Sequence, residues 1–263
     1  MKPSFNFQLV LIEKIKFEGT DVMSFKFNQH LDKLQKYQTP SLFEYTAGQY
    51  AYFNLDNVGN NDKGLIRHFT ISSSPTENFI MLSTKIRESQ YKHRLSTLEV
   101  GDKVKVSRPE GEFVLPEDYS KPLIFLSGGI GVTPFRSMIS YTTDKQLPLK
   151  IIMFDSNKNQ QNILFKKEFD DWTTLNDNLK IIYTLSEEDS NENSIVGGAE
   201  KWKGEIGRID KELILRHVDT NMLGNSTFYV CGPPDMLKSM QSLLENELEI
   251  PKERIKVEEF TGY

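Results

Sequence analysis

The sequence predicts two domains: an N-terminal, antiparallel six-stranded Greek-key β-barrel and a C-terminal α/β domain with a parallel sheet. Residues 1–117 contain short strand-like runs separated by turn residues, which is typical of a closed antiparallel barrel. Residues 118–263 instead alternate apolar strands with helical segments, the pattern of a parallel sheet with helices on both faces. The chain has 263 residues, a length that fits two domains of ordinary size.

Six runs in the first domain alternate in polarity or are rich in β-branched and aromatic residues. They lie at residues 7–17, 22–28, 48–55, 65–72, 79–86 and 102–109. One helical segment interrupts them at residues 91–102 and ends at Gly101. Residues 30–46 resemble an insertion, to which we assign no function.

The second domain reads as alternating strands and helices. Strands are expected at residues 122–129, 149–157, 179–187, 226–234 and 254–260. Helices are expected at residues 132–144, 161–175, 209–218 and 235–248. The boundary falls near residues 115–122, so the predicted domains are residues 1–117 and 118–263.

Composition excludes several classes of protein. The net charge of −5 argues against nucleic acid as the main partner, since phosphate binding needs a basic surface. The charge is uneven, +1 over residues 1–117 and −6 over residues 118–263. The single cysteine, Cys231, excludes an internal disulfide and an iron–sulfur cluster, which needs about four cysteines, and no metal site is expected. No apolar stretch reaches the ~20 residues of a membrane span, and the run at residues 9–12 is too short for a signal peptide. These features predict a soluble protein in the reducing environment of the cytoplasm.

A glycine-rich turn opens the second domain. In FLSGGIGVTPFRSM, Gly128, Gly129 and Gly131 lie between an expected strand and a helix that begins near Thr133 and Pro134. Glycines at such a turn let a pyrophosphate approach the backbone, and the N-terminus of the helix attracts its charge. Proline is also well placed in a first helical turn. The alternative is a tight turn without a ligand.

A second strand end carries the stretch YVCGPPDMLKSM. Cys231, Gly232 and Pro233 end an expected strand on the edge where open α/β sheets bind ligands. Cys231 would then point into the crevice at that edge. The alternative, which composition alone favours, is a small apolar filler.

The third stretch is RHFTISSSP in the first domain. Arg67 can neutralise a phosphate, Phe69 offers a flat face, and Thr70 can donate a hydrogen bond. Residues 72–74 add three serine hydroxyls before a proline, and the later stretch KIRESQYKHRL adds basic residues at the start of a helix. The alternatives are an edge strand with a serine-rich turn and a solvated basic face.

Together these stretches resemble the ferredoxin–NADP reductase superfamily over nearly the whole chain. That family has a flavin-binding barrel with an Arg-x-Tyr-(Ser/Thr) motif, which residues 67–70 match. Its nicotinamide-binding domain carries Gly-Gly-x-Gly-(Val/Ile)-(Thr/Ala)-Pro and Cys-Gly-Pro, which residues 128–134 and 231–233 match. The stretch Pro109-x-Gly111-x-Phe113 resembles the family's barrel-closing strand. The resemblance implies a stand-alone, FAD-dependent NAD(P)H oxidoreductase.

The resemblance also implies contacts with FAD. Arg67 would bind the flavin phosphate, Phe69 would lie against the isoalloxazine or the ribityl chain, and Thr70 would donate toward flavin N5. Phe69 replaces the usual tyrosine, so one hydrogen bond is lost while the stacking face remains. Ser89 fits the helix start that holds the second phosphate in FAD-binding relatives, which favours FAD over FMN. The cofactor-binding candidates of this domain are Arg67, His68, Phe69, Thr70, Ser72, Lys85, Arg87, Ser89 and Gln90, to which Lys92 could add charge.

The end of the chain is expected to complete the site. The ending VEEFTGY resembles a family ending in which an aromatic ring shields the flavin face that nicotinamide must reach. Phe260 and Tyr263 compete for this role, and the alternative is a frayed charged tail. The catalytic candidates are Thr70, Cys231 and Glu258, the last as a proton relay.

The choice of nucleotide depends on acidic residues. Asp155, near the end of the second strand, could bind both adenosine ribose hydroxyls and so favours NADH. Where NADPH-using relatives have a Ser-Arg pair after the third strand, this chain has Ser186 and Glu187, followed by two more acids that should repel a 2′-phosphate. Nearby basic residues could compensate: Lys201, Lys203 and Arg208. The nucleotide-binding candidates are Gly128, Gly129, Gly131, Thr133, Pro134, Asp155, Ser186, Cys231, Gly232 and Pro233.

The implied reaction passes a hydride from nicotinamide to flavin, and electrons then go to a separate acceptor. An acidic ferredoxin or flavodoxin would suit the basic residues 85–94, and an oxygenase component is a further acceptor. Two alternatives stay open: a reductase of free flavin or ferric chelates, and a flavin-bearing electron-transfer or regulatory subunit. The intact glycine and Cys-Gly-Pro motifs argue against the subunit.

Overall fold

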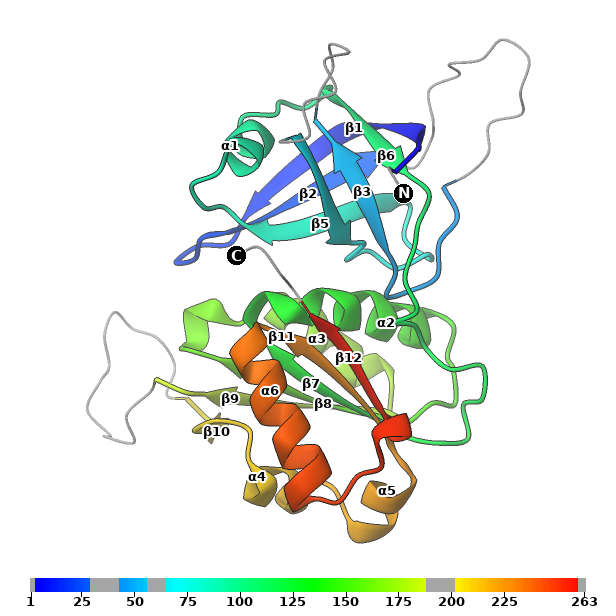
Figure 1. Cartoon of the computed structure of the whole chain (residues 1–263), viewed down its shortest axis with the longest axis vertical. Helices are drawn as coiled ribbons and strands as arrows, with labels where there is room; N and C mark the ends of the chain where they lie inside the picture. Colours follow the sequence, from blue (N-terminus) through cyan, green and yellow to red (C-terminus); the bar gives the residue numbers. More distant parts are fainter. Residues whose placement is uncertain (1–2, 29–42, 56–64, 188–201, 260–263) are drawn as a thin grey trace. The chain divides into compact units, whose positions relative to one another are not determined.

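The computed structural model describes residues 3–28, 43–55, 65–187 and 202–259. The chain divides into two compact units between Leu115 and Pro116 (Figure 1). The helix α2 (Thr133–Asp144) belongs to the first unit. The first unit holds a six-stranded antiparallel sheet and the second a six-stranded parallel sheet. This arrangement confirms the predicted fold class.

The sheet of the first unit has the strand order β4-β3-β6-β1-β2-β5. Its strands are β1 (Phe5–Lys16), β2 (Val22–Asn28), β3 (Tyr50–Asn54), β4 (Ile66–Thr70), β5 (Phe79–Lys85) and β6 (Lys103–Ser107). Because β6 lies between β3 and β1, the chain crosses from one side of the sheet to the other, as a Greek key requires.

Hydrogen bonds just beyond β4 close this sheet. The backbone N–H of Ser72 donates to the carbonyl oxygen of Met81 in β5 at 2.8 Å. The backbone N–H of Met81 donates in turn to Ser73 Oγ at 2.9 Å. These bonds link the chain just beyond the edge strand β4 to the other edge strand, β5, which closes the sheet at this point.

The core of the barrel follows from the alternation of its strands. Phe25 and Phe27 of β2 are fully buried on either side of Lys26, and Ser24, just before Phe25, is paired to Ser83 of β5. The helix α1 (Gln90–Ser96) adds Tyr91 and Leu95 to the same core. It ends earlier than the sequence suggests, because the chain turns before β6.

The sheet of the second unit has the strand order β10-β9-β8-β7-β11-β12, and all its neighbours are parallel. The strands are β7 (Leu123–Gly128), β8 (Ile151–Asn157), β9 (Leu179–Leu185), β10 (Glu205–Ile206), β11 (Thr227–Gly232) and β12 (Ile255–Glu259). The α-helices of this unit are α3 (Lys166–Leu175), α4 (Lys211–His217), α5 (Thr220–Asn225) and α6 (Pro234–Ser242). Short helical turns are η2 (Gly129–Val132), η3 (Gln160–Asn162), η4 (Leu243–Glu247) and η5 (Lys252–Arg254).

One face of the parallel sheet carries a large apolar core. Figure 1 shows α4, α5 and α6 along this face. Leu126, Phe154 and Val230 from the strands pack there with Leu213 and Leu237 from the helices. Within the described residues, no helix is long and apolar enough to cross a membrane.

The structure departs from the sequence prediction at several short elements. The helix expected at residues 161–175 begins only at Lys166, because Phe165 has a positive φ of 57° and the preceding residues form the turn η3. The helix expected at residues 235–248 changes to the π-helical turn η4 from Leu243 onward. β10 and α5 were not predicted, since two and six residues carry too little periodicity.

Candidate functional site

The glycine-rich turn lies directly against the Cys-Gly-Pro stretch. A Cβ atom on Gly131 would meet the carbonyl oxygen of Cys231 at 2.3 Å and the Cα atom of Gly232 at 2.7 Å. Only a glycine therefore lets η2 approach the end of β11 this closely. The two motifs that the sequence separates by a hundred residues form one surface at the carboxyl edge of the sheet, where open α/β folds bind ligands.

The other two glycines of this turn have different requirements. A Cβ atom on Gly128 would meet Sδ of Met236 in α6 at 2.1 Å, so this glycine allows close packing of strand and helix. Gly129 has a positive φ of 54°, and no atom lies within 4 Å of its Cβ position. Its role is conformational, and the space beside it is open. Thr133 and Pro134 follow directly as the first residues of α2.

Cys231 and Glu258 are neighbours in the register of β11 and β12. Cys231 is fully buried, and burial together with the Glu258 charge holds the pKa of its thiol well above the usual range. The thiol is therefore protonated at neutral pH and is a poor nucleophile. Burial raises the pKa of Glu258 to about 7, so this carboxyl group can hold or release a proton near neutrality.

Asp155 lies inside β8, two residues before the end of the strand, and its exposed fraction is 1%. The amide of Asn157 donates to Asp155 Oδ2 at 2.8 Å, and burial raises the pKa of Asp155 to about 7. The sequence placed this acid where it could meet a ribose, but the sheet buries it. Its contact with the adenosine ribose stays a prediction, and Asn157 occupies the strand end instead.

Ser186 and Glu187 follow β9 and are tied to the loop after β8. The N–H of Ser186 donates to the carbonyl oxygen of Asn157 at 2.9 Å, and Ser186 Oγ donates to the same oxygen at 3.3 Å. Glu187 pairs with Lys158 at 2.8 Å. Exposed pairs of this kind contribute little stability, so the carboxylate remains available to repel a phosphate. Lys203 and Arg208 are exposed beside β10, whereas Lys201 lies outside the described residues.

A cluster of cations surrounds Phe69 in the barrel. Lys92 Nζ lies 4.7 Å from the centroid of the Phe69 ring and contacts Thr84 Oγ1, and the Arg67 guanidinium lies 5.8 Å from the Tyr91 ring. Burial, and then the charges of Arg67 and Arg87, lower the pKa of Lys92 to about 8. Such mutual repulsion is relieved when an anion binds, so this cluster fits a phosphate group.

Thr70, the last residue of β4, is buried, and its hydroxyl has no hydrogen-bond partner among the described residues. A buried hydroxyl without a partner costs free energy, which a bound ligand can restore. Thr70 therefore fits the predicted donor to a heterocycle. The ring of His68, two residues earlier, packs against the rings of Tyr50 and Tyr52, with centroids 5.3 Å and 5.5 Å away.

The serines after Thr70 serve the barrel itself. Ser72 Oγ donates to the carbonyl oxygen of Met81 at 3.1 Å and pairs with Ser83 Oγ at 3.0 Å. Ser73 Oγ pairs with the Tyr45 hydroxyl at 2.9 Å. Ser74 Oγ pairs with Thr76 Oγ1 at 2.6 Å. All three hydroxyls before the proline thus have partners within the barrel unit, and the contact of the Ser72 hydroxyl with a cofactor stays a prediction.

The remaining candidates of the barrel lie around α1. Ser89 caps this helix by accepting from the N–H of Lys92 at 3.1 Å, and Gln90 is its first residue. Arg87 lies 3.7 Å from Asp21, and Lys85 ends β5. Two candidates of the chain end lie outside the described residues: Phe260 and Tyr263.

Sequence reasoning missed one buried ion pair in the first unit. Arg136 of α2 donates to both carboxylate oxygens of Glu77, at 2.9 Å and 3.1 Å, and to the carbonyl oxygen of Ser72 at 2.8 Å. The arginine has an exposed fraction of 1%, so the pair fixes the turn after Thr70 from inside. An arginine in a helical segment whose only other charged residue is Asp144, at its end, was the available signal, but its partner could not be read from the sequence.

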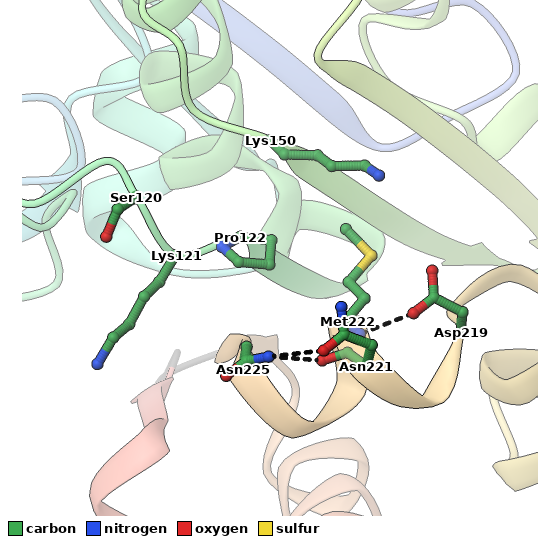
Figure 2. Close-up of a pocket in the computed structure, with 8 residues that line it drawn as sticks. All are labelled: Ser120, Lys121, Pro122, Lys150, Asp219, Asn221, Met222 and Asn225. Carbon is green, nitrogen blue, oxygen red and sulfur yellow. Dashed lines mark hydrogen bonds between the residues drawn. The ribbon is translucent and has the colours of Figure 1, made fainter.

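A cavity of about 330 Å³ lies elsewhere, where β7 and β8 begin (Figure 2). In Figure 2, the side-chain amide of Asn225 donates hydrogen bonds to Asn221, and the carboxylate of Asp219 accepts one from the backbone N–H of Met222. Asp219 is the N-cap of α5, and the other three residues lie in this helix. The full lining is Ser120, Lys121, Pro122, Lys150, Asp219, Asn221, Met222 and Asn225. This is the amino edge of the sheet, and it contains none of the predicted site residues.

Comparison with known proteins bears on both units. Residues 125–242 match the family model of the oxidoreductase NAD-binding domain. The chain is 26% identical to flavohemoprotein A of Dictyostelium discoideum over 95% of its own length and 59% of that protein. It thus spans about three fifths of the length of this relative and of flavohemoprotein B from the same organism.

Two solved structures share the two-unit fold. The flavohem-like FAD/NAD-binding domain of nitric oxide dioxygenase from Vibrio cholerae has a TM-score of 0.75 at 19% identity, covering 98% of this chain and 99% of that one. The ferredoxin–NADP⁺ reductase of Plasmodium falciparum has a TM-score of 0.71 at 19% identity, covering 97% and 96%. At this identity the likeness concerns the fold.

Proposed function

We propose that this chain is a member of the ferredoxin–NADP reductase superfamily and a flavoprotein reductase that takes a hydride from NAD(P)H onto FAD and passes electrons to a separate acceptor. Residues 1–117 would hold FAD and residues 118–263 the nucleotide. The observation that supports this most directly is the buried, unpartnered hydroxyl of Thr70 at the end of the strand that carries Arg67 and Phe69.

The residues of the barrel fit a flavin dinucleotide. FAD, when bound, supplies the hydride acceptor and a carrier that can release electrons singly or in pairs. Thr70 would donate the hydrogen bond that it lacks, and Phe69 would give the ring face. Arg67, Arg87 and Lys92 would hold the pyrophosphate, whose charge relieves their repulsion.

The residues of the second unit fit a nicotinamide nucleotide. The turn at residues 128–132 would receive the pyrophosphate, because Gly129 leaves open space beside its backbone. Cys231 would remain a neutral thiol beside the nicotinamide, and Glu258 would hold or release a proton. NADH is the proposed donor, since the exposed Glu187 side chain lies where a 2′-phosphate would have to bind.

The acceptor is proposed to be a separate protein, an acidic ferredoxin or flavodoxin or an oxygenase component. The basic residues 85–94 of the barrel support an acidic partner, because opposite charge accelerates encounter. A cytoplasmic location belongs to the same proposal and can be checked by cell fractionation.

The test begins with the purified protein. Heat-released cofactor should run as FAD on chromatography, and stopped-flow mixing with NADH should bleach the flavin absorbance. Arg67→Ala should lose most of the flavin, whereas Lys16→Ala, an exposed cation at the end of β1, should retain it. Release of FMN alone would contradict the dinucleotide site, and a flavin that NADH and NADPH both leave oxidised would contradict the reductase.

A further inference from the structure

A row of polar side chains crosses the parallel sheet just inside its carboxyl edge. The strand register places Cys231 between Glu258 and Ser127. It places Ser127 in turn between Cys231 and Asp155. Registered neighbours point to the same face of a sheet, about 5 Å apart. We call these four residues the polar row.

The opposite face of the sheet is apolar at the same level. Leu126, Phe154 and Val230 directly precede members of the polar row, and all three lie in the core beside α4, α5 and α6. Because side chains alternate along a strand, the polar row faces the other way. The change from apolar to polar is therefore confined to one face.

Ser127, Asp155 and Cys231 are buried and Glu258 is half-buried, yet the hydrogen bonds of the polar row are incomplete. Asp155 Oδ1, Ser127 Oγ and Glu258 Oε2 have no hydrogen-bond partner among the described residues. The Ser127 hydroxyl is near enough to Asp155 to oppose the rise of its pKa, but no well-aligned hydrogen bond joins them. A proton on either carboxyl group would add a hydrogen-bond donor to a group that, when ionised, can only accept.

No described cation forms an ion pair with Asp155. Asn157 of the same strand donates one hydrogen bond, and Ser127 approaches from β7. From β9, Tyr183 lies beside Asp155 in the register, and its hydroxyl donates to Asp170 of α3 at 3.0 Å. The nearest cation along this path is Lys166, whose Nζ lies over the Tyr183 ring at 5.0 Å from its centroid. The ionised form of Asp155 is thus poorly compensated, which agrees with a pKa of about 7.

We propose that the polar row stores a proton beneath the nucleotide site, and that Asp155 takes up a proton when a dinucleotide binds at the carboxyl edge. This inference rests on the proposed function, because it needs the nucleotide at that edge. Ser127 lies one residue before the glycine turn that would receive the pyrophosphate. Two added phosphate charges favour the neutral form of a nearby carboxyl group, so binding and protonation assist each other.

The residues between the two acids allow the proton to move. A thiol and a hydroxyl can each accept one proton and donate another, so Cys231 and Ser127 can connect Asp155 with Glu258. Glu258, at the partly exposed end of the row, would exchange the proton with solvent. No bond other than to hydrogen forms or breaks, and no oxidant or reductant is needed.

Calorimetry of NAD⁺ binding to the holoprotein, in buffers of different ionisation enthalpy, measures the proton uptake directly. At about pH 7 we expect roughly 0.5 proton per nucleotide, and between about pH 6 and 8 the Kd should rise by up to about tenfold. Asp155→Asn keeps the side-chain size and should reduce both effects, and adding Glu258→Gln should abolish them. Asp177→Asn, an exposed aspartate before β9, is the matched control and should behave as wild type.

Carbon-13 NMR of aspartate carboxyl groups tests the free protein without any variant. One aspartate should titrate near pH 7, far from the rest, and its resonance should shift toward the protonated position when NAD⁺ is added. If every aspartate titrates near its ordinary pKa, or if NAD⁺ binds without proton uptake, the inference is overturned while the proposed function stands. If neither NAD⁺ nor NADP⁺ binds at any pH, the proposed function is contradicted, and the inference that rests on it is contradicted as well.

Discussion

Replacing Gly131 by alanine would place a methyl group against the backbone of β11. The new Cβ atom would lie 2.3 Å from the carbonyl oxygen of Cys231 and 2.6 Å from its carbonyl carbon, whereas ordinary contacts begin near 3.4 Å. Backbone atoms cannot rotate away, so η2 and β11 must separate by about 1 Å, a clash that costs ~1–3 kcal/mol. For a chain of this size the unfolding midpoint should fall by ~2–4 °C for each kcal/mol.

Gly224→Ala is the control for this substitution. Gly224 lies in α5, and no atom lies within 4 Å of its Cβ position. Alanine has the better helix propensity by about 1 kcal/mol, so Gly224→Ala should leave the midpoint unchanged or raise it.

Thermal unfolding followed by circular dichroism measures the first effect, and NAD⁺ titration of the folded variant measures a second. Because the turn that would receive the pyrophosphate must move, Gly131→Ala should also weaken NAD⁺ binding at least several-fold. A variant that melts within about 1 °C of wild type and binds NAD⁺ equally would refute the close approach of η2 to β11.

Three further predictions concern charge. Arg67→Ala should weaken FAD binding by ~1.5–3 kcal/mol, read from flavin release during dialysis, because a charge-assisted bond to phosphate is lost. Glu187→Arg should shift the ratio of kcat/KM from NADH toward NADPH, and a wild type that already prefers NADPH tenfold would contradict the charge argument. Burial raises the pKa values of Asp155 and Glu258 to about 7, so the folded state binds more protons than the unfolded state between about pH 4 and 7. The free energy of unfolding should therefore fall as pH rises through that window, and urea titrations should show a shallower fall in Asp155→Asn.

The sequence predicts much of the fold because local alternation determines most of the strands. The strand expected at residues 22–28 is β2 over the same residues, and the helix expected at residues 132–144 is α2 from Thr133 to Asp144. The closure of the barrel is different. It depends on Ser72 and Ser73 meeting Met81 across a turn, and no local pattern encodes such a contact.

The candidate site also has parts that the sequence could predict and parts that it could not. The motifs could locate Thr70, Gly131 and Cys231, because their residue types follow from local backbone and chemical needs. The sequence could not show that Asp155 is buried, since this depends on how far β8 extends beyond it and on the register with β7. The bidentate pair between Arg136 and Glu77 joins residues 59 positions apart, so the sequence could not predict it either.

Both units contain buried polar atoms without a hydrogen-bond partner among the described residues. Five buried side-chain atoms of the described residues have no hydrogen-bond partner, and all five lie at or near the ends of strands: Thr70, Ser127, Asp155, Asn157 and Glu258. Each such atom costs ~1–3 kcal/mol, so a fold held only by its core would not gather them there. In the first unit the group without a partner is a hydroxyl, which could donate a hydrogen bond to a heterocycle. In the second unit the groups are mainly acceptors, which a proton would satisfy. The proposed functions of the two units follow this difference: Thr70 of the barrel can donate a hydrogen bond to a ligand, and Asp155 of the parallel sheet can accept a proton.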